Sequence, residues 1–290
     1  MSVKAKVCKF CDFFSGLPII GNLIKPKPRV SVIRLSGVIA DSGPGRGGIS
    51  HNRFEKSIFY AFEEFDLKAV LLVINSPGGS PAQSSLIGDQ IRRLAEEKDV
   101  PVYAFIEDVA ASGGYWLACA ADEIYANETS IVGSIGVISA SFGFKELIEK
   151  HGIERRIQTS GKNKSFMDSF SDLKPADVKR LKDIQWELHE TFIGWVKDRR
   201  GEKLEGEDAK LFDGSFWSGK TALKLGLIDG FSSARRFAKA KFGNDIKYVE
   251  FGPDKKLVPS LFGIKSQNAS LAEDAIDVIE KKSIWARYGL

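Results

Sequence analysis

Short apolar runs separated by helix-length amphipathic stretches constrain the fold of this 290-residue chain more than any other feature. Residues Val30 to Ile39 alternate and are rich in β-branched side chains, whereas Ala69 to Ile74 and Val100 to Ile106 are almost continuously apolar. Continuous apolar runs are typical of strands that are covered on both faces of a parallel sheet. Parallel strands need long crossover connections, which are usually helices. The sequence therefore predicts an α/β fold with right-handed crossovers.

The stretches that follow these strands carry apolar residues at helical spacing, which predicts amphipathic helices packed on the sheet. The predicted apolar stripes are Phe54, Ile58, Ala61, Phe62 and Phe65; Leu86, Ile87, Ile91 and Leu94; and Val178, Leu181, Ile184, Leu188, Phe192 and Val196. The third stripe follows Pro175 and predicts one long helix, because proline is favoured at the first helical position.

The rest of the chain predicts shorter elements that continue the alternation of strand and helix. Short strands are expected at Glu123 to Ala126, Ile135 to Ile138, Ile153 to Gln158, Leu227 to Asp229 and Ile246 to Phe251. Short helices are expected at Lys145 to Lys150, twice within Asp208 to Leu225, and at Ser232 to Lys241. Residues Asp41 to Gly48 are rich in glycine and are expected to form a loop.

Charge and cysteine content exclude several classes of protein. The net charge of +4 comes from 42 basic and 38 acidic residues spread along the chain, and no basic block marks a nucleic-acid-binding face. The cysteines Cys8, Cys11 and Cys119 are too few for a disulfide framework. Cys8 and Cys11 form a Cys-x-x-Cys pair without a second pair of zinc ligands, so no metal or other cofactor is expected. The role of this pair stays open.

The predicted organisation has three segments: residues 1–29, a main domain at 30–245, and a C-terminal extension at 246–290 that we expect to serve assembly. The first segment is apolar with basic flanks, but Asp12, Pro18 and Asn22 interrupt it, so it falls short of the roughly 20 apolar residues of a membrane-spanning helix. No cleavage pattern of a secretory signal follows it. Two roles remain open for this segment, a peripheral membrane contact and docking on the protein itself.

Small residues replace large apolar ones at residues 110–114, shortly after an apolar run. Ala110-Ala111-Ser112-Gly113-Gly114 follows the predicted strand that ends at Ile106 and leads into an apolar, helix-like segment. Glycine lets backbone approach backbone closely, and the N-terminus of a helix presents unpaired N–H groups. Ser112 would then stand at a strand-to-helix bend where a developing oxyanion can be stabilised. An ordinary tight packing site fits these residues equally well.

A second glycine turn ends another predicted strand. Asn75-Ser76-Pro77-Gly78-Gly79 lies at the edge of the sheet where open α/β proteins place their ligands. An outward-facing N–H group from this turn would complete a two-donor oxyanion site with the N–H near Ser112 or Gly113. A plain loop is the alternative interpretation of the turn, since Pro-Gly turns are common.

A serine nucleophile also needs a base. The three histidines, His51, His151 and His189, are isolated from one another in the sequence, and each is expected at the surface rather than beside Ser112. A lysine can serve instead when burial lowers its pKa. The turn Ser160 to Lys164 offers two lysines, Lys162 and Lys164, and these considerations do not choose between them.

Four motifs occur together in a fixed order and at specific separations: Asn75-Ser-Pro-Gly-Gly79, Ala111-Ser-Gly-Gly-Tyr115, Gly133-Ser-Ile-Gly-Val137 and Ser160-Gly-Lys-Asn-Lys164. Together they resemble the signal peptide peptidase A family of serine proteases, in its short, single-unit form. The resemblance covers about Val30 to Lys241. The chain departs from the family in its interrupted N-terminal segment, because family members usually carry an obvious membrane anchor there.

The resemblance implies roles for five residues. It makes Ser112 the nucleophile, Lys164 rather than Lys162 the base, and Ser134 a hydrogen-bond partner of that lysine. It makes Gly79 an oxyanion donor, with Gly113 as the second donor. It also implies a fold like that of the crotonase and Clp protease superfamily, with a parallel sheet, repeated β-β-α units and a long helix toward the C-terminus.

The resemblance further implies an activity and an assembly. The chain is expected to be a serine endopeptidase that cleaves extended apolar peptides, such as signal-peptide remnants or membrane-associated polypeptides, through an acyl-enzyme. Subunits are expected to form a homo-oligomeric ring in which serine and lysine meet across neighbours. The location implied is a bacterial cytoplasm or membrane surface, and the number of subunits and the natural substrate stay open.

Two alternatives remain. A crotonase-type acyl-CoA hydratase or isomerase shares the fold and the oxyanion pair, but it normally uses glutamates as bases. A non-catalytic, membrane-associated scaffold is the other alternative, and the intact set Ser112, Ser134 and Lys164 argues against it.

Overall fold

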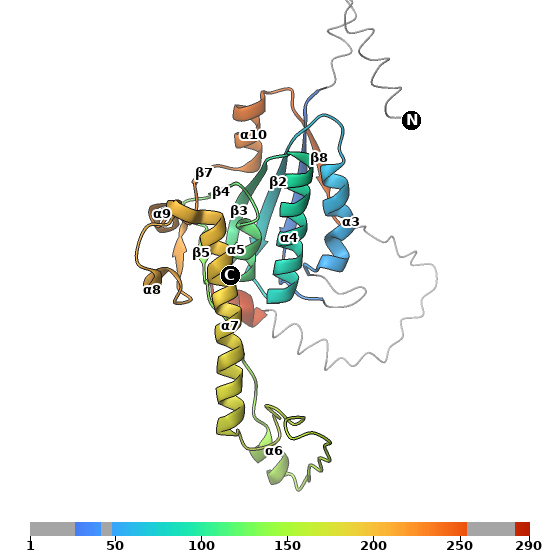
Figure 1. Ribbon diagram of the computed structural model, residues 1–290, viewed down its shortest axis with the longest axis vertical. Helices are drawn as coiled ribbons and strands as arrows, with labels where there is room; N and C mark the ends of the chain where they lie inside the picture. The colour runs from blue at the N-terminus through green and yellow to red at the C-terminus, as the bar shows by residue number, and fades with distance from the viewer. Residues whose placement is uncertain (1–26, 42–47, 254–281) are drawn as a thin grey trace, which may run out of the picture.

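The computed structural model describes residues 27–41, 48–253 and 282–290, and its centre is one eight-stranded sheet (Figure 1). The strands are β1 (Arg29–Ser36), β2 (Leu67–Ser76), β3 (Val102–Ala111), β4 (Glu123–Ala126), β5 (Ile131–Gly133), β6 (Phe216–Ser218), β7 (Gly230–Phe231) and β8 (Lys247–Phe251). The helices are α3 (His51–Phe62), α4 (Pro81–Lys98), α5 (Gly113–Ala118), α6 (Lys145–Lys150), α7 (Pro175–Arg200), α8 (Asp208–Leu211), α9 (Gly219–Lys224), α10 (Ala234–Phe242) and a 3₁₀ turn, η1 (Gly201–Lys203). Residues 282–286 add a helical turn near the C-terminus.

The sheet is parallel throughout except at one edge. Its strand order is β6-β5-β3-β2-β1-β8, and β4 and β7 continue from the side of β3. Only β5 and β6 pair antiparallel. The first half of β3 pairs with β4, and its second half pairs with β5. The pairing of β3 with β5 therefore ends at Ala111, directly before Ser112. The predicted α/β class with a parallel sheet is confirmed.

The β-β-α expectation is met through short β bridges. After β1, Ile39 bridges both Ile49 and Gly79 before α3 begins. Gly79 itself follows β2 and precedes α4, and the end of β3 that pairs with β5 precedes α5. Each of the first three strands is therefore followed by a second, short β-paired element and then a helix.

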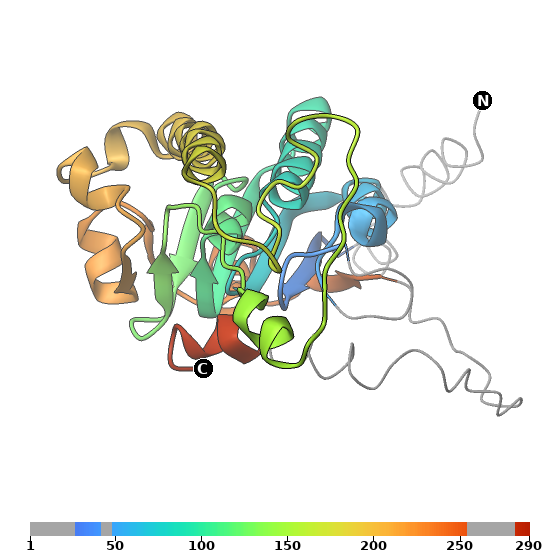
Figure 2. The ribbon, with the colours of Figure 1, turned by 90° about the horizontal axis from the view of Figure 1, so that it is seen from below.

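Two cores lie on opposite faces of the sheet. Alternate residues of β2 divide between them, because side chains along a strand point to opposite faces. Leu72 and Ile74 enter the larger core, beneath α3, α4, α5 and α7, whereas Leu71 and Val73 enter the smaller core beneath α10. Figure 2 shows α4 and α7 on one side of the sheet and the C-terminal turn on the other.

Helix ends follow the local chemistry of the sequence. α4 begins with Pro81 after Ser80, whose side chain accepts a hydrogen bond from the Gln83 N–H. This cap satisfies one of the free donors at the helix N-terminus. α4 ends where Asp99 takes a left-handed conformation. α10 begins in the same way as α4, with the Ser233 side chain accepting from the Arg236 N–H.

Several predicted elements are correct within a few residues. β1, β2, β3, β4, β8, α6 and α7 lie where the patterns placed them, and so does the basic helix, as α10. The two short helices within residues 208–225 are α8 and α9, with β6 between them. Four positions in the predicted stripes are exposed, because Phe65 lies beyond α3 and Leu86 lies on the solvent side of α4. The other two are Ile184 and Leu188 on α7.

Three predicted strands are wrong. The strand expected at residues 135–138 lies earlier, as β5, because Gly133 and Ser134 both take a positive φ that ends the extended backbone. Residues 153–158 are exposed and irregular, since no described strand pairs with them. The strand expected at residues 227–229 is instead the neighbouring β7.

Other expectations concern the segment boundaries. β8 pairs with β1, so residues 247–251 lie in the same sheet as the main domain. Most of the predicted first segment, with Cys8 and Cys11, lies outside the described residues. None of the described helices is both long enough and apolar enough to cross a membrane.

Candidate active site

Ser112 stands at a sharp turn between β3 and α5. Its φ of +52° and ψ of −125° are unusual for a residue with a side chain. Such a conformation is strained and persists only where surrounding contacts enforce it. The Ser112 N–H donates to the Gly133 carbonyl at 2.8 Å, and the Ser112 carbonyl accepts from the Tyr115 and Trp116 N–H groups at 2.9 and 3.0 Å. These bonds hold the half-buried serine at the tip of the bend.

The turn after β2 packs directly against this bend. A Cβ atom added to Gly78 would lie 2.8 Å from the Ser112 Cβ and 2.9 Å from the Gly113 nitrogen. A Cβ added to Gly114 would lie 2.4 Å from the Ser76 carbonyl oxygen. Only glycine permits backbone segments to approach this closely. The two glycine motifs are therefore one structural unit.

Two backbone N–H groups in this unit have no hydrogen-bond partner among the residues that the structure describes. The Ile39 N–H donates to the Gly78 carbonyl and the Ser80 N–H donates to the Ile39 carbonyl, which leaves the Gly79 N–H outside the bridge. Gly113 is the first residue of α5, where N–H groups lack acceptors within the helix. A Cβ on Gly113 would lie 3.5 Å from the Gly79 nitrogen, so the two groups lie in one small region.

Ser134 lies directly after β5, one residue beyond the carbonyl that binds Ser112. Its φ is +54°, and its N–H donates to the Ser215 carbonyl at 2.7 Å. Its hydroxyl accepts a hydrogen bond from Tyr288 near the C-terminus, with a distance of 3.3 Å between the two oxygens. The sheet pairing of β3 with β5 thus places Ser112 and Ser134 at neighbouring strand ends.

Lys164 lies apart from these residues. It belongs to the segment between α6 and α7, which projects away from the sheet beyond the start of α7 (Figure 1). Lys162 and Lys164 are both exposed. Within the described residues, neither side chain forms a hydrogen bond or ion pair, and only the Lys164 backbone N–H is bonded, to the Gly161 carbonyl at 3.2 Å. A single chain therefore does not bring Lys164 to Ser112.

A small apolar cavity of about 80 Å³ opens beside Ser112. Its polar edge is formed by Gly79, Ser112 and Gly113, and its apolar walls come from four different parts of the chain. The apolar lining residues are Pro81, Trp116, Val137, Ile138, Leu188 and Phe192. Trp116 and Phe192 pack ring against ring, with centroids 5.0 Å apart. The sequence did not mark these residues as part of a site, because nothing local distinguishes Leu188 or Phe192 from the rest of the apolar stripe of α7.

No histidine replaces the lysine at this site. His189 on α7 contacts the Ile135 carbonyl through Nε2 at 3.1 Å, and His51 donates from its backbone to the Gln83 side chain. His151 is exposed at the end of α6. Across residues 27–41, 48–253 and 282–290, none of the three contacts Ser112. The same residues contain no cluster of three or more His, Cys, Asp or Glu that could hold a metal ion.

Other buried ionisable groups belong to the scaffold. Burial raises the pKa of the Cys119 thiol to about 12, so this thiol stays protonated and unreactive. Burial also raises the pKa of Tyr115, whose hydroxyl donates to the Leu227 carbonyl at 2.8 Å. Arg200 at the end of α7 binds Asp229 at 2.7 Å and so anchors the helix that carries Leu188 and Phe192. None of these groups reaches the Ser112 cavity.

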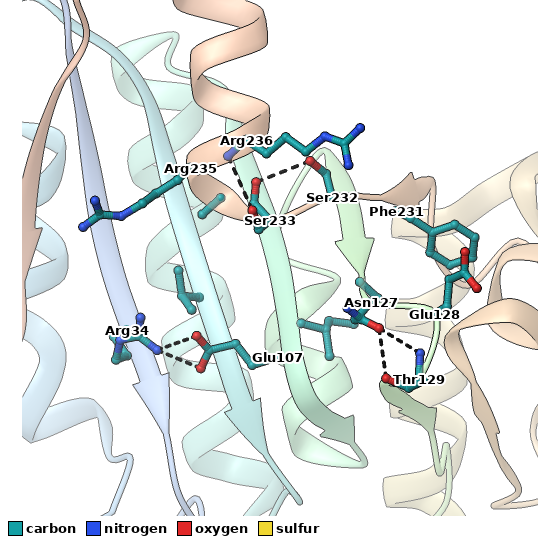
Figure 3. A pocket seen from close by; sticks show the side chains of 14 residues that line it. Arg34, Glu107, Asn127, Glu128, Thr129, Phe231, Ser232, Ser233, Arg235 and Arg236 are labelled. Carbon is teal, nitrogen blue, oxygen red and sulfur yellow. Dashed lines mark hydrogen bonds and ion pairs between the residues drawn. The ribbon is translucent and has the colours of Figure 1, made fainter. Parts of the chain in front are cut away.

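A larger cavity, of about 770 Å³, lies on the opposite face of the sheet, between the start of α10 and the strands. Figure 3 shows Arg34 and Glu107 paired over the strands there, with Ser232, Ser233 and Asn127 around them. Two serines that line this cavity belong to the start of α10: the Ser233 side chain accepts from the Arg236 N–H, and the Ser232 hydroxyl donates to the Ser233 carbonyl at 3.3 Å.

Several known proteins are similar to this chain. The first relative is a protein of Brucella abortus named Na(+)/H(+) antiporter NhaA, which is 46% identical over 272 residues, covering 90% of this chain and 37% of that protein. The second is the chloroplastic serine protease SPPA of Arabidopsis thaliana, 33% identical over 83% of this chain and 37% of that protein. The chain thus spans about 37% of the length of each relative.

A solved structure and a family model complete the comparison. A mutant of the 1510-N membrane-bound stomatin-specific protease, in complex with a substrate peptide, aligns with 79% of this chain and 94% of its own, with 16% identity and a TM-score of 0.49. The model of Peptidase family S49 matches residues 94–242, just over half of the chain, including Ser112, Ser134 and Lys164. The chain belongs to peptidase family S49.

Proposed function

We propose that this protein is a serine endopeptidase with Ser112 as its nucleophile. The observation that carries the proposal is the position of Ser112, at a strained bend beside the free N–H groups of Gly79 and Gly113 and at the edge of an apolar cavity. Strain at a nucleophile exposes its hydroxyl, and two convergent donors stabilise the charge that develops on a carbonyl oxygen.

The proposed reaction proceeds through an acyl-enzyme. The Ser112 oxygen attacks the carbonyl carbon of the scissile peptide while the neutral amine of Lys164 accepts the serine proton. The carbonyl oxygen becomes an oxyanion held by the N–H groups of Gly79 and Gly113. Collapse breaks the C–N bond, the protonated lysine returns its proton to the leaving amine, and water activated by the same lysine releases the acyl group. Ser134 orients the lysine through its hydroxyl.

The lysine is supplied by a neighbouring subunit in this proposal. Lys164 lies in a segment that projects from the sheet, away from the Ser112 of its own chain. Residues 142–173, which include this segment, and the adjacent half of α7 expose several large apolar side chains: Phe142, Leu147, Ile153, Leu173, Ile184 and Trp186. Exposed apolar side chains of this size are typical of protein interfaces. A homo-oligomeric ring would bury this surface and deliver Lys164 to the next subunit.

The substrates proposed are extended, apolar peptides, such as signal-peptide remnants. The cavity beside Ser112 supports this because its walls are apolar and its volume of about 80 Å³ suits a small or medium side chain. The acyl-CoA hydratase and the non-catalytic scaffold find no support in these residues. Peripheral contact with a membrane remains a further expectation of the proposal.

The test is hydrolysis of a fluorogenic peptide with alanine before the cleavage site. Ser112→Ala and Lys164→Ala should each abolish hydrolysis without dissociating the assembly, whereas Lys162→Ala should retain it. Co-expression of Ser112→Ala with Lys164→Ala should restore part of the activity, because some neighbours then combine an intact serine with an intact lysine. Normal hydrolysis by Lys164→Ala would disprove the proposed base, and mixed assemblies without activity would disprove the shared site.

A further inference from the structure

The strand that leads to Ser112 contains a bulge just before the site. Ile74 of β2 pairs with Ile106 of β3, but the next pair joins Ser76 to Ala110. One residue of β2, Asn75, therefore lies opposite the three residues 107–109 of β3. Bulges bend a strand and change the direction of the side chains that follow, and they are common next to active sites. The geometry of this bulge therefore fixes where Ser112 lies relative to the turn after β2.

A single side-chain pair closes the bulge. The Asn75 amide nitrogen donates to an Asp108 carboxylate oxygen at 2.7 Å. Hydrogen bonds to a carboxylate are shorter and stronger than those between neutral groups. Asn75 precedes Gly79 by four residues, and Asp108 precedes Ser112 by four residues. The bond thus joins the two strands immediately upstream of the oxyanion donor and of the nucleophile.

Asn75 is held from a second side as well. Its backbone carbonyl accepts from the Gly37 N–H at 2.9 Å, which fixes it to the end of β1. Its side-chain carbonyl oxygen is buried and has no hydrogen-bond partner among the described residues. An unpaired buried acceptor lowers stability. An apolar residue would avoid this cost, so stability alone does not account for an asparagine here.

The neighbouring bulge residue, Glu107, is exposed like Asp108 but pairs with a different strand. Glu107 forms a two-pronged ion pair with Arg34, at 2.7 and 2.8 Å, over the face of the sheet that carries the larger cavity (Figure 3). Both side chains are about half exposed, 42% for Glu107 and 56% for Arg34. Exposed ion pairs contribute little. Glu107 therefore provides a matched control for a change of charge at the same bulge.

We propose that Asn75 and Asp108 are positioning residues, which hold the Gly79 N–H and the Ser112 hydroxyl in the register needed for catalysis. The inference rests on the proposed peptidase function. Neither residue lines the cavity at Ser112, so each acts through the backbone and not through contact with the peptide.

The experiment compares the full chain with Asn75→Asp, with Asp108→Asn and with both together. Asn75→Asp places two carboxylates together, and we expect kcat to fall about 10- to 100-fold, approaching the effect of losing one oxyanion donor. KM should change less than about two-fold, because substrate binding is untouched. Asp108→Asn keeps an acceptor without its charge and should cost only a few-fold.

The double variant is the most informative comparison, because it exchanges donor and acceptor and so restores the hydrogen bond between positions 75 and 108. Its kcat should return to within a few-fold of wild type, while Glu107→Gln stays near wild type throughout. Failure of the double variant to recover activity, or an unchanged kcat in Asn75→Asp, would overturn the inference. Should Asn75→Asp fold poorly by circular dichroism, Asn75→Ala, which removes the amide donor without adding a charge, takes its place, and an unchanged kcat there would equally overturn the inference. A wild-type protein that hydrolyses no peptide would instead refute the peptidase proposal itself.

Discussion

Gly78 lies so close to Ser112 that a Cβ atom on Gly78 would come within 2.8 Å of the Ser112 Cβ. The backbone of Gly78 also has a φ of +98°, which disfavours residues with side chains. The proposed nucleophile and the turn that carries a proposed oxyanion donor are therefore packed together through one residue without a side chain.

Gly78→Ala should reduce both hydrolysis and stability. The left-handed backbone alone costs about 1–2 kcal/mol for alanine, and the contact with Ser112 forces the turn away from the bend. Gly37→Ala is the matched control, because Gly37 has a φ of +108° but nothing within 4 Å of an added Cβ. The control should lose only the backbone contribution of about 1–2 kcal/mol in urea denaturation and should keep its kcat. Equal activity of the two variants would show that the close approach does not matter.

Asp229→Asn should destabilise the fold strongly. The variant leaves Arg200 without its charged partner, and the Arg200 side chain is only 2% exposed. Removing one member of a buried ion pair costs about 3–5 kcal/mol in unfolding free energy. Asp183→Asn, which breaks the exposed pair with Lys179 on α7, should cost about 0–1 kcal/mol. Urea denaturation at pH 7 measures both, and similar losses would contradict the expectation.

The same pair makes stability depend on pH. Burial by itself would raise the pKa of Asp229, but hydrogen bonds from Arg200 and Lys203 outweigh it and hold the pKa below its usual value. The stabilisation is therefore complete above the unfolded-state pKa of about 4 and is lost as the pH falls through the lower folded-state pKa. The difference in stability between wild type and Asp229→Asn should shrink below about pH 4. A constant difference from pH 7 to pH 3 would argue against this ionisation.

Leu188→Ala should broaden the choice of substrate side chain. Leu188 borders the cavity beside Ser112 and is 40% exposed, so its truncation costs little stability. Each methylene in an apolar pocket is worth about 1–3 kcal/mol of discrimination, so kcat/KM for phenylalanine relative to alanine at the cut should rise about ten-fold. Leu223→Ala, on α9 and away from the cavity, is the control. A ratio that is unchanged in Leu188→Ala would remove this cavity from the proposed binding site.

Thiol reagents should leave hydrolysis intact. Cys119 is fully buried, and burial raises its pKa to about 12, so little thiolate exists at neutral pH. In a Cys8→Ser, Cys11→Ser background, iodoacetamide should label Cys119 in guanidinium but not in buffer. Loss of activity on native labelling would point to a role for this cysteine that the proposed mechanism does not include.

The fold was predicted from local patterns of apolar residues, and most of the predicted helices and strands are present in the structure. The apolar run at Ala69 to Ile74 became the central strand β2, and Pro175 opens α7 as expected. A local pattern predicted a strand wrongly where the fold places no other strand beside the segment. Residues 153–158 include two β-branched side chains, Ile153 and Ile157, but stay irregular, because no described strand lies beside them.

The sequence by itself determined the α/β class, the bend at Ser112 and the glycine turn at Gly79, since apolar periodicity and glycine spacing act over a few residues. Only the tertiary structure decided that Gly79 and Gly113 lie together beside Ser112 and that Leu188 and Phe192 line a cavity there. It also decided that the segment between α6 and α7, which carries Lys164, projects away from the sheet (Figure 1). These relationships join residues separated by whole crossovers. The path of the helices and the pairing of the strands set them, and local periodicity does not encode either one.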